Sequence, residues 1–560
     1  MDSKNVILAI VFSSLVLIIW AVFFEPPPPK PITNESKVEK MQEENNLSYP
    51  SIETSEEKKV ILRSDTLKTS KRIFFENENI SGSISLTGGI IDDVILKNYT
   101  KELNSEERVV LLNPNNSDDG YYIETGWAST SSDIELPGNK TQWSVKGNTT
   151  LTPNAPVTLE WENDDGIKFL KIINLDEKFL FRVTQQIKNN GNNSYNFYPY
   201  AQIVRIKKPP TLGFYILHEG FIGVFDQELK EEDYTDIEKK KYTGNFSSGW
   251  LGITDKYWIT AIVPEKNKNF KSEFIYDKNY RANFILTEPI RSTPNQSVSS
   301  EVRIFTAAKE VAAIDDYAEN QNIEKFDLTI DWGWFYFFTK PLFFVADYFF
   351  KLTGNFGLAI ILITACIRLL FFPLANYSFR SMAKMKVLQP EMVRLKELHK
   401  EDKVKLQQEM MALYKREKVN PISGCLPVLI QIPFFFAIYK MLFVTIEMRQ
   451  QPFFGWIQDL SARDPTSVFN LFGLIPWDPP SFLLIGAWPI MMGATMYIQQ
   501  KLNPTPPDPI QAKIFMFFPL FLTIILAPFP SGLVLYWTIN NVLTMTQQWV
   551  IIKRTKVKTV

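Results

Sequence analysis

The sequence contains few of the residues that form metal sites or disulfide scaffolds. Its 560 residues include two cysteines, Cys366 and Cys425, and two histidines, His218 and His399. Two cysteines form at most one disulfide, which excludes a disulfide-stabilised scaffold, and two histidines exclude a His-rich metal site. An excess of one charge is also missing, because 60 basic and 61 acidic side chains leave a net charge of −1. The charge balance therefore predicts no general attraction to nucleic acid.

Aromatic residues and long apolar runs are abundant instead. Phe, Trp and Tyr make up 14% of the chain, which excludes a polar, disordered protein, and the length favours two or more domains. From Val6 to Phe24, 19 consecutive residues carry no charge, close to the ~20 that cross a bilayer as a helix. A cleaved signal peptide, the alternative, would have a shorter apolar run of ~7–15 residues. We predict a transmembrane anchor over residues 1–24 and a flexible, Pro-rich and charged linker over residues 25–59.

Five further apolar runs follow beyond residue 350. They are Phe356–Leu374, Cys425–Val444, Phe482–Gln500, Ile514–Phe529 and Leu533–Ile552. Together with the anchor they predict six spans. Lys and Arg remain on the cytoplasmic side of membranes, and the chain has eleven of them between residues 375 and 420 but two between 445 and 481. We therefore expect both termini in the cytoplasm and residues 25–352 outside it.

A further aromatic segment, residues 331–352, is predicted to lie in the membrane interface rather than to cross the membrane. Lys340, Asp347 and Lys351 are seven and four residues apart, which places them on one face of a helix, opposite aromatic side chains. A helix with a charged edge and an aromatic body is typical of the interface. As a seventh span it would also move the basic tail, residues 553–560, out of the cytoplasm, against the charge rule.

Residues 60–330 alternate between apolar and polar side chains, with turn residues at the boundaries, which predicts half-buried strands. We expect a large antiparallel β-sandwich, including a hairpin that turns at residues 277–279. Asp92 and Asp93 are neighbours on a strand, so their side chains should point to opposite faces. The lone His218 is more often structural than catalytic. We therefore predict no enzymatic activity and no cofactor.

Arg368 is a charge well inside the second predicted span, about 9 Å from its cytoplasmic end at 1.5 Å per residue. Such an arginine costs roughly 2.5–3.5 kcal/mol unless it reaches water or a partner. Its long stem could carry the guanidinium to the interface, and position alone does not separate this alternative from a functional role. The second to sixth spans contain no Asp or Glu that would neutralise the charge.

Polar residues of other spans lie in the same cytoplasmic half of the predicted bundle. Gln431 is six residues into the third span. The last span has a polar stripe with spacings of four, three and four: Trp537, Asn541, Thr544 and Gln548. Lipid cannot satisfy such groups, so they bond between helices or contact water. We predict a hydrated, positively charged cavity that opens to the cytoplasm.

The segment between the second and third spans, residues 375–420, is predicted to form an antiparallel helical hairpin that turns near residues 399–402. Apolar residues recur along it at three, four and seven: Met382, Met385, Met392 and Leu395, then Leu406, Met410 and Leu413. Methionine-rich faces suit adaptable partner contacts. Packing of the two helices against each other explains the pattern equally well.

Three runs of this sequence resemble a known family: SMAKMKVLQPEM from Ser381, EMMALYKREKVNPISGCLPVLIQIPFF from Glu409 and PSGLVLYW from Pro530. They are similar to the YidC-type membrane protein insertases of Gram-negative bacteria, which have a large periplasmic domain. The similarity is dense within the predicted five-span core, residues 353–552, and agrees in order and size for the parts before it. The Pro-rich segment Val468–Pro480 is longer than expected for the family and leaves the outer end of the fourth span undefined.

The resemblance implies an insertase and chaperone that places nascent membrane proteins in the inner membrane, alone or with the Sec translocon. The groove arginine of the family falls on Arg368. Polar groove positions fall on Thr364 and Gln431, and an aromatic pair near the substrate falls on Tyr536 and Trp537. The implied partners of the hairpin and the basic tail are the ribosome and signal-recognition targeting machinery. The lipid bilayer surrounds the spans, and no sequence-specific binding of nucleic acid is implied.

Two other functions fit parts of the sequence. A transporter of small solutes or lipids could use a polar cavity, but the paired intramembrane carboxylates and the internal repeat of many transporters are missing. A membrane-tethered carbohydrate enzyme would place its chemistry in the exported domain. Deletion of residues 60–320 would separate an insertase from such an enzyme. An insertase would keep most of its activity, whereas the enzyme would lose all of it.

Overall fold

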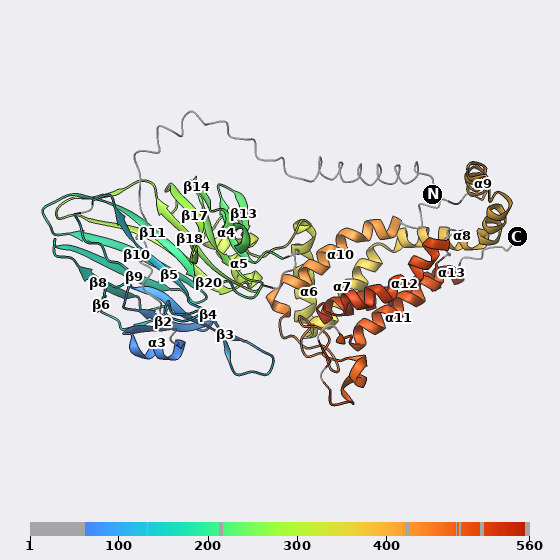
Figure 1. Cartoon of the computed structure of the whole chain (residues 1–560), viewed down its shortest axis with the longest axis horizontal. Coiled ribbons are helices and arrows are strands. Elements are labelled where there is room, and N and C mark those ends of the chain that lie inside the picture. The colour runs from blue at the N-terminus through green and yellow to red at the C-terminus, as the bar shows by residue number, and fades with distance from the viewer. Residues whose placement is uncertain are drawn as a thin grey trace. The chain divides into compact units, whose positions relative to one another are not determined.

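The computed structural model describes residues 62–554 apart from residues 132, 212–216, 418, 420–425, 478, 481–482 and 504–508. The predicted anchor, the predicted linker and residues 555–560 of the basic tail lie outside the described residues. The described chain has a β-rich part followed by a helical part (Figure 1).

The strands of the β-rich part form two sheets. In spatial order, the first contains β14 (Tyr242–Phe246), β17 (Phe270–Asp277), β18 (Asn279–Leu286), β11 (Tyr195–Arg205), β5 (Tyr121–Ser129), β3 (Ile90–Thr100), β2 (Ile80–Ser85), β1 (Arg72–Glu76) and β7 (Thr150–Leu151), while β19 (Ile290–Ser292) pairs with β11 and β4 (Arg108–Leu112) with β3. The second contains β13 (Glu228–Asp233), β12 (Gly220–Phe225), β15 (Gly249–Thr254), β16 (Trp258–Val263), β20 (Ser297–Ala308), β10 (Leu180–Asn189), β9 (Ile167–Leu175), β8 (Val157–Glu162) and β6 (Ser144–Lys146).

The two sheets share one apolar core. Phe75 of β1 meets Phe181 of β10 edge to face, with ring centroids 5.1 Å apart, and Phe221 of β12 meets Phe274 of β17 at 5.2 Å. These contacts join the sheets because alternate residues of each strand point inward. The described strand pairings are antiparallel except for the parallel pairing of β1 with β7. The predicted hairpin is confirmed, since β17 pairs with β18 around Lys278.

The prediction that Asp92 and Asp93 point to opposite faces is wrong. The register between β2 and β3 shifts between Ser83 and Ile84, where a β-bulge adds one residue to β3. Arg72 pairs with Asp92 and donates to the hydroxyl of Ser83, which in turn donates to Asp93. The bulge therefore joins both carboxylates in one hydrogen-bonded network.

Helices accompany and follow the strands. Those of the β-rich part are α3 (Arg63–Thr69), α4 (Tyr234–Lys239), α5 (Val311–Asn320) and the 3-10 helix η1 (Phe326–Thr329). The helical part comprises α6 (Tyr336–Thr353), α7 (Phe356–Leu370), α8 (Phe372–Leu398), α9 (Lys403–Arg416), α10 (Leu426–Val444), α11 (Ala487–Leu502), α12 (Pro509–Leu526) and α13 (Ser531–Arg554), with the 3-10 helices η3 (Ile446–Met448) and η4 (Val468–Gly473) between α10 and α11.

No single described helix is both long enough and apolar enough for a membrane span. α7 and α8 reach that length and hydropathy only as a pair, bent by 69° at the break, and the shorter apolar helices are Gln431–Val444 and Gln511–Leu526. The fourth predicted span begins as helix α11 only at Ala487, because the backbone of Gly486 is extended and Asp464 accepts the N–H of Trp488. The six spans therefore stay a prediction.

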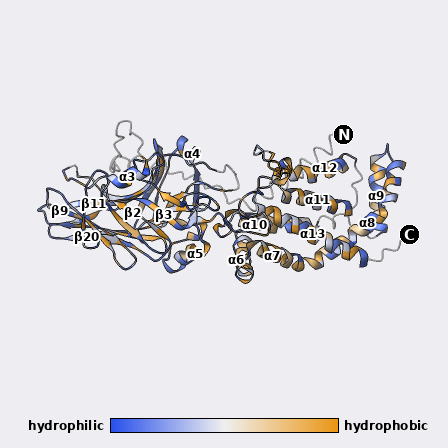
Figure 2. Cartoon of the chain, turned by 90° about the horizontal axis from the view of Figure 1, so that it is seen from below, coloured by the Kyte–Doolittle hydropathy of each residue, from blue (hydrophilic) through white to orange (hydrophobic). Residues whose placement is uncertain are grey.

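The outer faces of the helical part are strongly apolar. On α12, the exposed side chains include Ile514, Phe515, Phe517, Leu520 and Phe521, and the hydropathy colours show hydrophobic residues along this helix (Figure 2). On α6, Phe343 and Ala346 are buried whereas Phe337, Tyr348 and Leu352 are exposed. Exposed apolar surface on this scale marks an interaction with lipid or with another protein.

Candidate functional site

Arg368 of α7 is held by a neutral amide rather than by a carboxylate. Its Nε donates to Asn540 Oδ1 at 2.9 Å and its Nη2 donates to the same oxygen at 2.6 Å. Asn540 belongs to α13, and neither α7 nor α13 contains an Asp or Glu. The hydrogen bonds fix the direction of the half-buried guanidinium but leave its positive charge in place.

Gln431 of α10 reaches the same amide. Its Nε2 donates to Asn540 Oδ1 at 3.0 Å, so Asn540 Oδ1 accepts hydrogen bonds from two neighbouring helices. Phe435, one turn further along α10, lies 4.9 Å from the ring of Trp537 and 6.3 Å from that of Tyr536, measured between centroids. The site therefore combines one cation, two amides and an aromatic wall from α7, α10 and α13.

The polar residues of the stripe predicted on the last span do not all contact the same helix. Asn541 and Gln548 face α11, because Asn541 Nδ2 donates to Thr495 Oγ1 at 3.2 Å and Gln548 Nε2 donates to Asn503 Oδ1 at 3.1 Å. Thr544 donates to the carbonyl of Asn540 within α13 at 2.5 Å. The contacts of Asn541 and Gln548 tie α13 to α11, away from Arg368.

Thr364 makes its hydrogen bond within its own helix. Its side chain is buried, and its hydroxyl donates to the carbonyl of Ile360 at 2.6 Å, one turn back in α7. A back-bonded threonine of this kind has satisfied its own donor. Of the predicted polar residues, Arg368 and Gln431 are therefore brought together through Asn540, with Tyr536 and Trp537 beside them, whereas the hydroxyl of Thr364, one turn before Arg368 on α7, bonds its own helix.

Sequence analysis missed two residues of this region, Asn540 and Gln547. With Thr544, which also belongs to the predicted stripe, they follow a spacing of four and three along α13. Both amide atoms of Gln547 and the hydroxyl of Ser378 on α8 are buried and have no hydrogen-bond partner among the described residues. The signal that could have identified this spacing is the pair of adjacent asparagines, since neighbours on a helix point about 100° apart.

The predicted helical hairpin is present as α8 and α9, with its turn at residues 399–402. Met392 and Leu413 are buried, and the Tyr414 hydroxyl lies 3.9 Å from the sulfur of Met392. Met392 and Leu413 of the predicted stripe therefore pack between the two helices, whereas Met382 packs against Ala375, Phe379 and Ile551. Lys384, Lys386 and other basic residues of α8 are exposed.

The buried charges of the β-rich part have structural partners. Lys171 donates to the carbonyls of Gly88, Gly89 and Thr125, and burial lowers the pKa of its ammonium to about 8. His218 contacts the carbonyl of Phe221 at 2.8 Å. In the part of the chain that the structure describes, no three His, Cys, Asp or Glu side chains are grouped so as to hold a metal ion.

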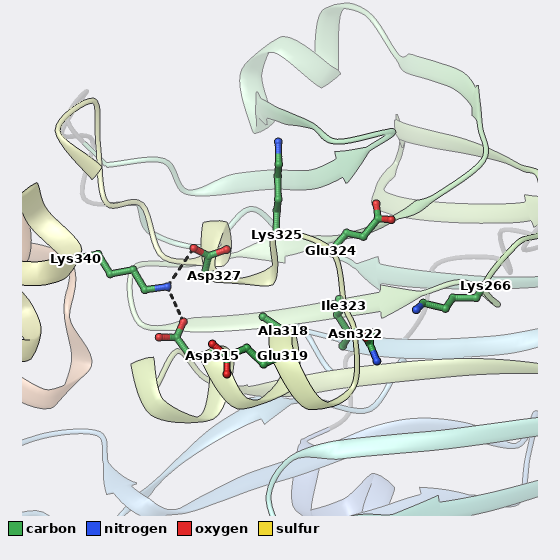
Figure 3. A pocket seen from close by; sticks show the side chains of 10 residues that line it. All are labelled: Lys266, Asp315, Ala318, Glu319, Asn322, Ile323, Glu324, Lys325, Asp327 and Lys340. Atoms are coloured by element: carbon green, nitrogen blue, oxygen red, sulfur yellow. Dashed lines mark hydrogen bonds and ion pairs between the residues drawn. The ribbon is translucent and has the colours of Figure 1, made fainter. Parts of the chain in front are cut away.

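A polar pocket of about 460 Å³ lies where the β-rich part continues into α6. Figure 3 shows Lys340 of α6 between Asp315 and Asp327, and its Nζ lies 2.8 Å and 3.2 Å from their carboxylate oxygens. These ion pairs raise the pKa of Lys340 against the opposing effect of its burial. The pocket lining thus contains paired charges that attach α6, which gives no sign of a particular ligand.

Comparison with known proteins assigns both parts of the chain. The model of the YidC periplasmic domain matches residues 72–345, and the model of the 60Kd inner membrane protein matches residues 348–558. A protein of Pelagibacter ubique named membrane protein insertase YidC is 59% identical over 562 residues, covering 100% of both chains. This chain belongs to the YidC family.

Other members of the YidC family are similar over their whole length as well. The membrane protein insertase YidC of Mesorhizobium japonicum is 43% identical and covers 99% of this chain and 96% of its own. A crystal structure described as the active YidC insertase with its first transmembrane domain resolved covers 87% of this chain and 93% of its own, at 17% identity and a TM-score of 0.35. The cluster around Arg368 lies in the part that matches the inner membrane protein model of the YidC family.

Proposed function

We propose that this chain inserts nascent membrane proteins into the inner membrane through a groove at Arg368. One observation carries the proposal: a guanidinium in the region that matches the inner membrane protein model bonds a neutral amide, in helices that contain no carboxylate. An arginine retained only for packing would be expected to have an acidic partner. Here the charge is oriented by Asn540 and stays available to a substrate.

The polar neighbours of Arg368 support a hydrated path on its cytoplasmic side. Gln547 lies two turns beyond Asn540 on α13, and Ser378 lies on α8, which contacts α13. Buried amides and hydroxyls without a protein partner are commonly satisfied by ordered water. A wet path that reaches into the membrane shortens the apolar barrier that a hydrophilic segment must cross.

The mechanism follows from the charge and from the aromatic wall. The guanidinium attracts the acidic, hydrophilic tail of a substrate by charge. The apolar helix of the substrate slides along Phe435, Tyr536 and Trp537 and leaves sideways into lipid. Burial of its apolar surface drives the step without ATP.

The topology and partners belong to the same proposal. Both termini are cytoplasmic, residues 25–352 are periplasmic, and α6 lies in the outer interface. The exposed basic surface of the hairpin then faces the cytoplasm, where it meets the ribosome or signal-recognition targeting machinery. The chain acts alone or with the Sec translocon.

Substitutions at Arg368 and Asn540 test the function. Arg368→Ala should reduce insertion of substrates with acidic tails by tenfold or more, whereas Arg368→Lys should be largely tolerated because the charge is kept. Asn540→Asp should resemble Arg368→Ala, since the new carboxylate neutralises the guanidinium at hydrogen-bonding distance. The measurement is insertion of matched substrates with acidic and neutral tails into vesicles that contain the purified chain.

Asn540→Ser is the matched control, because it keeps a short neutral acceptor at the same position. It should retain most of the insertion activity. Equal loss with Arg368→Lys and Arg368→Ala, or full activity of Asn540→Asp, would show that the guanidinium has a structural role and would contradict the proposal.

A further inference from the structure

The segment from Ser467 to Trp477, here called the outer loop, lies between α10 and α11 and contains η4. Its eleven residues, SVFNLFGLIPW, include no charged side chain. It begins the Pro-rich segment that sequence analysis found to be longer than expected, and the groove around Arg368 does not use it.

The side chains of the outer loop are turned outward. The exposed ones are Val468, Phe469, Leu471, Phe472, Leu474, Ile475 and Trp477. Leu474 is 83% exposed. A contiguous apolar surface of this kind on a described segment marks a site of contact with lipid or protein.

The backbone of the outer loop is satisfied largely within the loop and its base. Phe472 donates to the carbonyl of Ser467 at 2.7 Å, Ile475 to that of Asn470 at 3.0 Å, and Val468 to that of Ile485 at 3.0 Å. The side chains of Ser467 and Asn470 accept the N–H groups of Phe469 and Gly473. Backbone groups satisfied in this way can enter an apolar phase without the cost of unpaired donors.

Two bulky residues of the outer loop adopt the left-handed backbone region. Leu471 has φ 50° and Phe472 has φ 58°, a conformation that is uncommon for residues other than Gly, Asn and Asp. Both side chains remain exposed, so burial within the protein does not compensate for the conformation. An apolar environment outside the protein would compensate for it.

We propose that the outer loop inserts its apolar side chains into the outer leaflet of the lipid bilayer. The inference rests on the proposed topology, which places the outer ends of α10 and α11 at the periplasmic surface of the membrane. The outer loop is held next to the start of α11, because Val468 donates to the carbonyl of Ile485, and it therefore lies at the level of that helix end. Trp477 at its end matches the preference of tryptophan for the interface, and the absence of charge removes the main cost of insertion.

Lipid fits the outer loop better than a protein partner does. A protein partner usually adds directional hydrogen bonds to apolar contact, and the loop has used much of its backbone hydrogen-bonding capacity internally. Lipid requires apolar surface and satisfied backbone groups alone.

Spin labels on single cysteines test the insertion. In the full-length chain with Cys366→Ser and Cys425→Ser, the substitutions Leu474→Cys and Ile475→Cys are labelled and the protein is placed in vesicles of phosphatidylethanolamine and phosphatidylglycerol. Collisions with oxygen, which concentrates in lipid, are compared with collisions with a water-soluble nickel chelate. Phe517→Cys on α12 is the lipid reference, and Phe74→Cys on β1 is the aqueous reference.

The labels at 474 and 475 should prefer oxygen to the nickel chelate, as the label at 517 does. Labels that behave like the one at 74 would overturn the proposal, and so would labels shielded from both reagents, because a protein would then cover the loop. A label at 517 in water would contradict the proposed topology, and labels at 474 and 475 in lipid would still support insertion of the loop. The two failures are therefore distinguishable.

Discussion

The β-rich part and the helical part both bury polar groups, but they satisfy them differently. In the β-rich part Arg72 pairs with Asp92 and Arg205 with Asp255 at 2.8 Å. In the helical part Arg368 bonds the neutral Asn540. The β-rich part therefore neutralises these buried arginines with carboxylates, whereas Arg368 of the helical part keeps its charge.

The difference follows from the electrostatics of burial. A buried cation with a carboxylate partner is locally neutral, and removal of either member leaves an uncompensated charge. A buried cation with an amide partner keeps its field, which acts on any anion that approaches. The same residue type is thus neutralised in one part of the chain and keeps its charge in the other.

The largest expected effect concerns the buried ion pair of the β-rich part. The side chains of Arg72 and Asp92 are 2% and 3% exposed, so Arg72→Ala leaves a buried carboxylate without its cation. We expect a loss of about 3–5 kcal/mol in the free energy of unfolding of the β-rich part. The measurement is the denaturant dependence of its proteolysis in the full-length chain.

The matched control is Arg182→Ala, because Arg182 pairs with Glu301 at the surface, where the side chains are 42% and 36% exposed. An exposed pair contributes at most about 1 kcal/mol. If Arg72→Ala and Arg182→Ala had equal effects on the free energy of unfolding, the buried ion pair would contribute no more than the exposed one. That result would contradict the comparison for the β-rich part.

A smaller effect is expected at Glu447 in η3, where the two parts are in contact. Its Oε1 accepts the N–H of Val311 at 2.8 Å, and its Oε2 is buried without a partner among the described residues. Burial raises the pKa of Glu447 from 4.5 to about 7, and the nearby carboxylates of Glu310 and Asp347 add to the increase. The folded protein therefore favours the protonated form of this group.

Because the pKa is raised on folding, the contribution of Glu447 to stability is fully present below about pH 4.5 and is lost as the pH rises through about 7. Glu447→Gln keeps the acceptor for Val311 and removes the titration. It should raise stability at pH 8 by about 1–2 kcal/mol and flatten the decline of the melting temperature between pH 5 and pH 8. Glu288→Gln, at an exposed position, should change neither; an unaltered pH profile in Glu447→Gln would exclude this assignment.

The smallest effect distinguishes the two neighbouring glutamines of α13. Gln548 bonds Asn503, so Gln548→Leu should cost about 1–2 kcal/mol. If water satisfies Gln547, Gln547→Leu should change the thermal stability by less than about 1 kcal/mol and slow insertion several-fold. Melting temperatures and insertion rates of the two variants measure this difference. A clear stabilisation by Gln547→Leu would mean that its amide is buried dry, which would contradict a hydrated path.

Much of the fold follows from local patterns. The alternation of apolar and polar residues predicted the strands, and the residues around Lys278 predicted the hairpin of β17 and β18. The bulge at Asp92 was not predictable, because it depends on the register of β3 against β2. The start of α11 was also missed, since it depends on Asp464, which lies more than twenty residues earlier in the sequence.

The site was only partly predictable for a similar reason. Arg368 and Gln431 stand out as polar residues in apolar runs, so composition identifies them. The sequence does not distinguish Asn540 from Asn541. In the structure Asn540 bonds Arg368, and Asn541 bonds Thr495. The choice depends on how α13 is rotated against its neighbours.

By itself the sequence determined where apolar runs and strands occur, and that Arg368 has no acidic residue in the apolar runs around it. These properties depend on residue type and spacing, which act locally along the chain. Only the tertiary structure decided that Asn540 orients the guanidinium, that Met392 packs inside the hairpin, and that the outer loop exposes its apolar side chains. Such choices arise when packing fixes the rotation and register of whole elements against one another, and no local pattern specifies them.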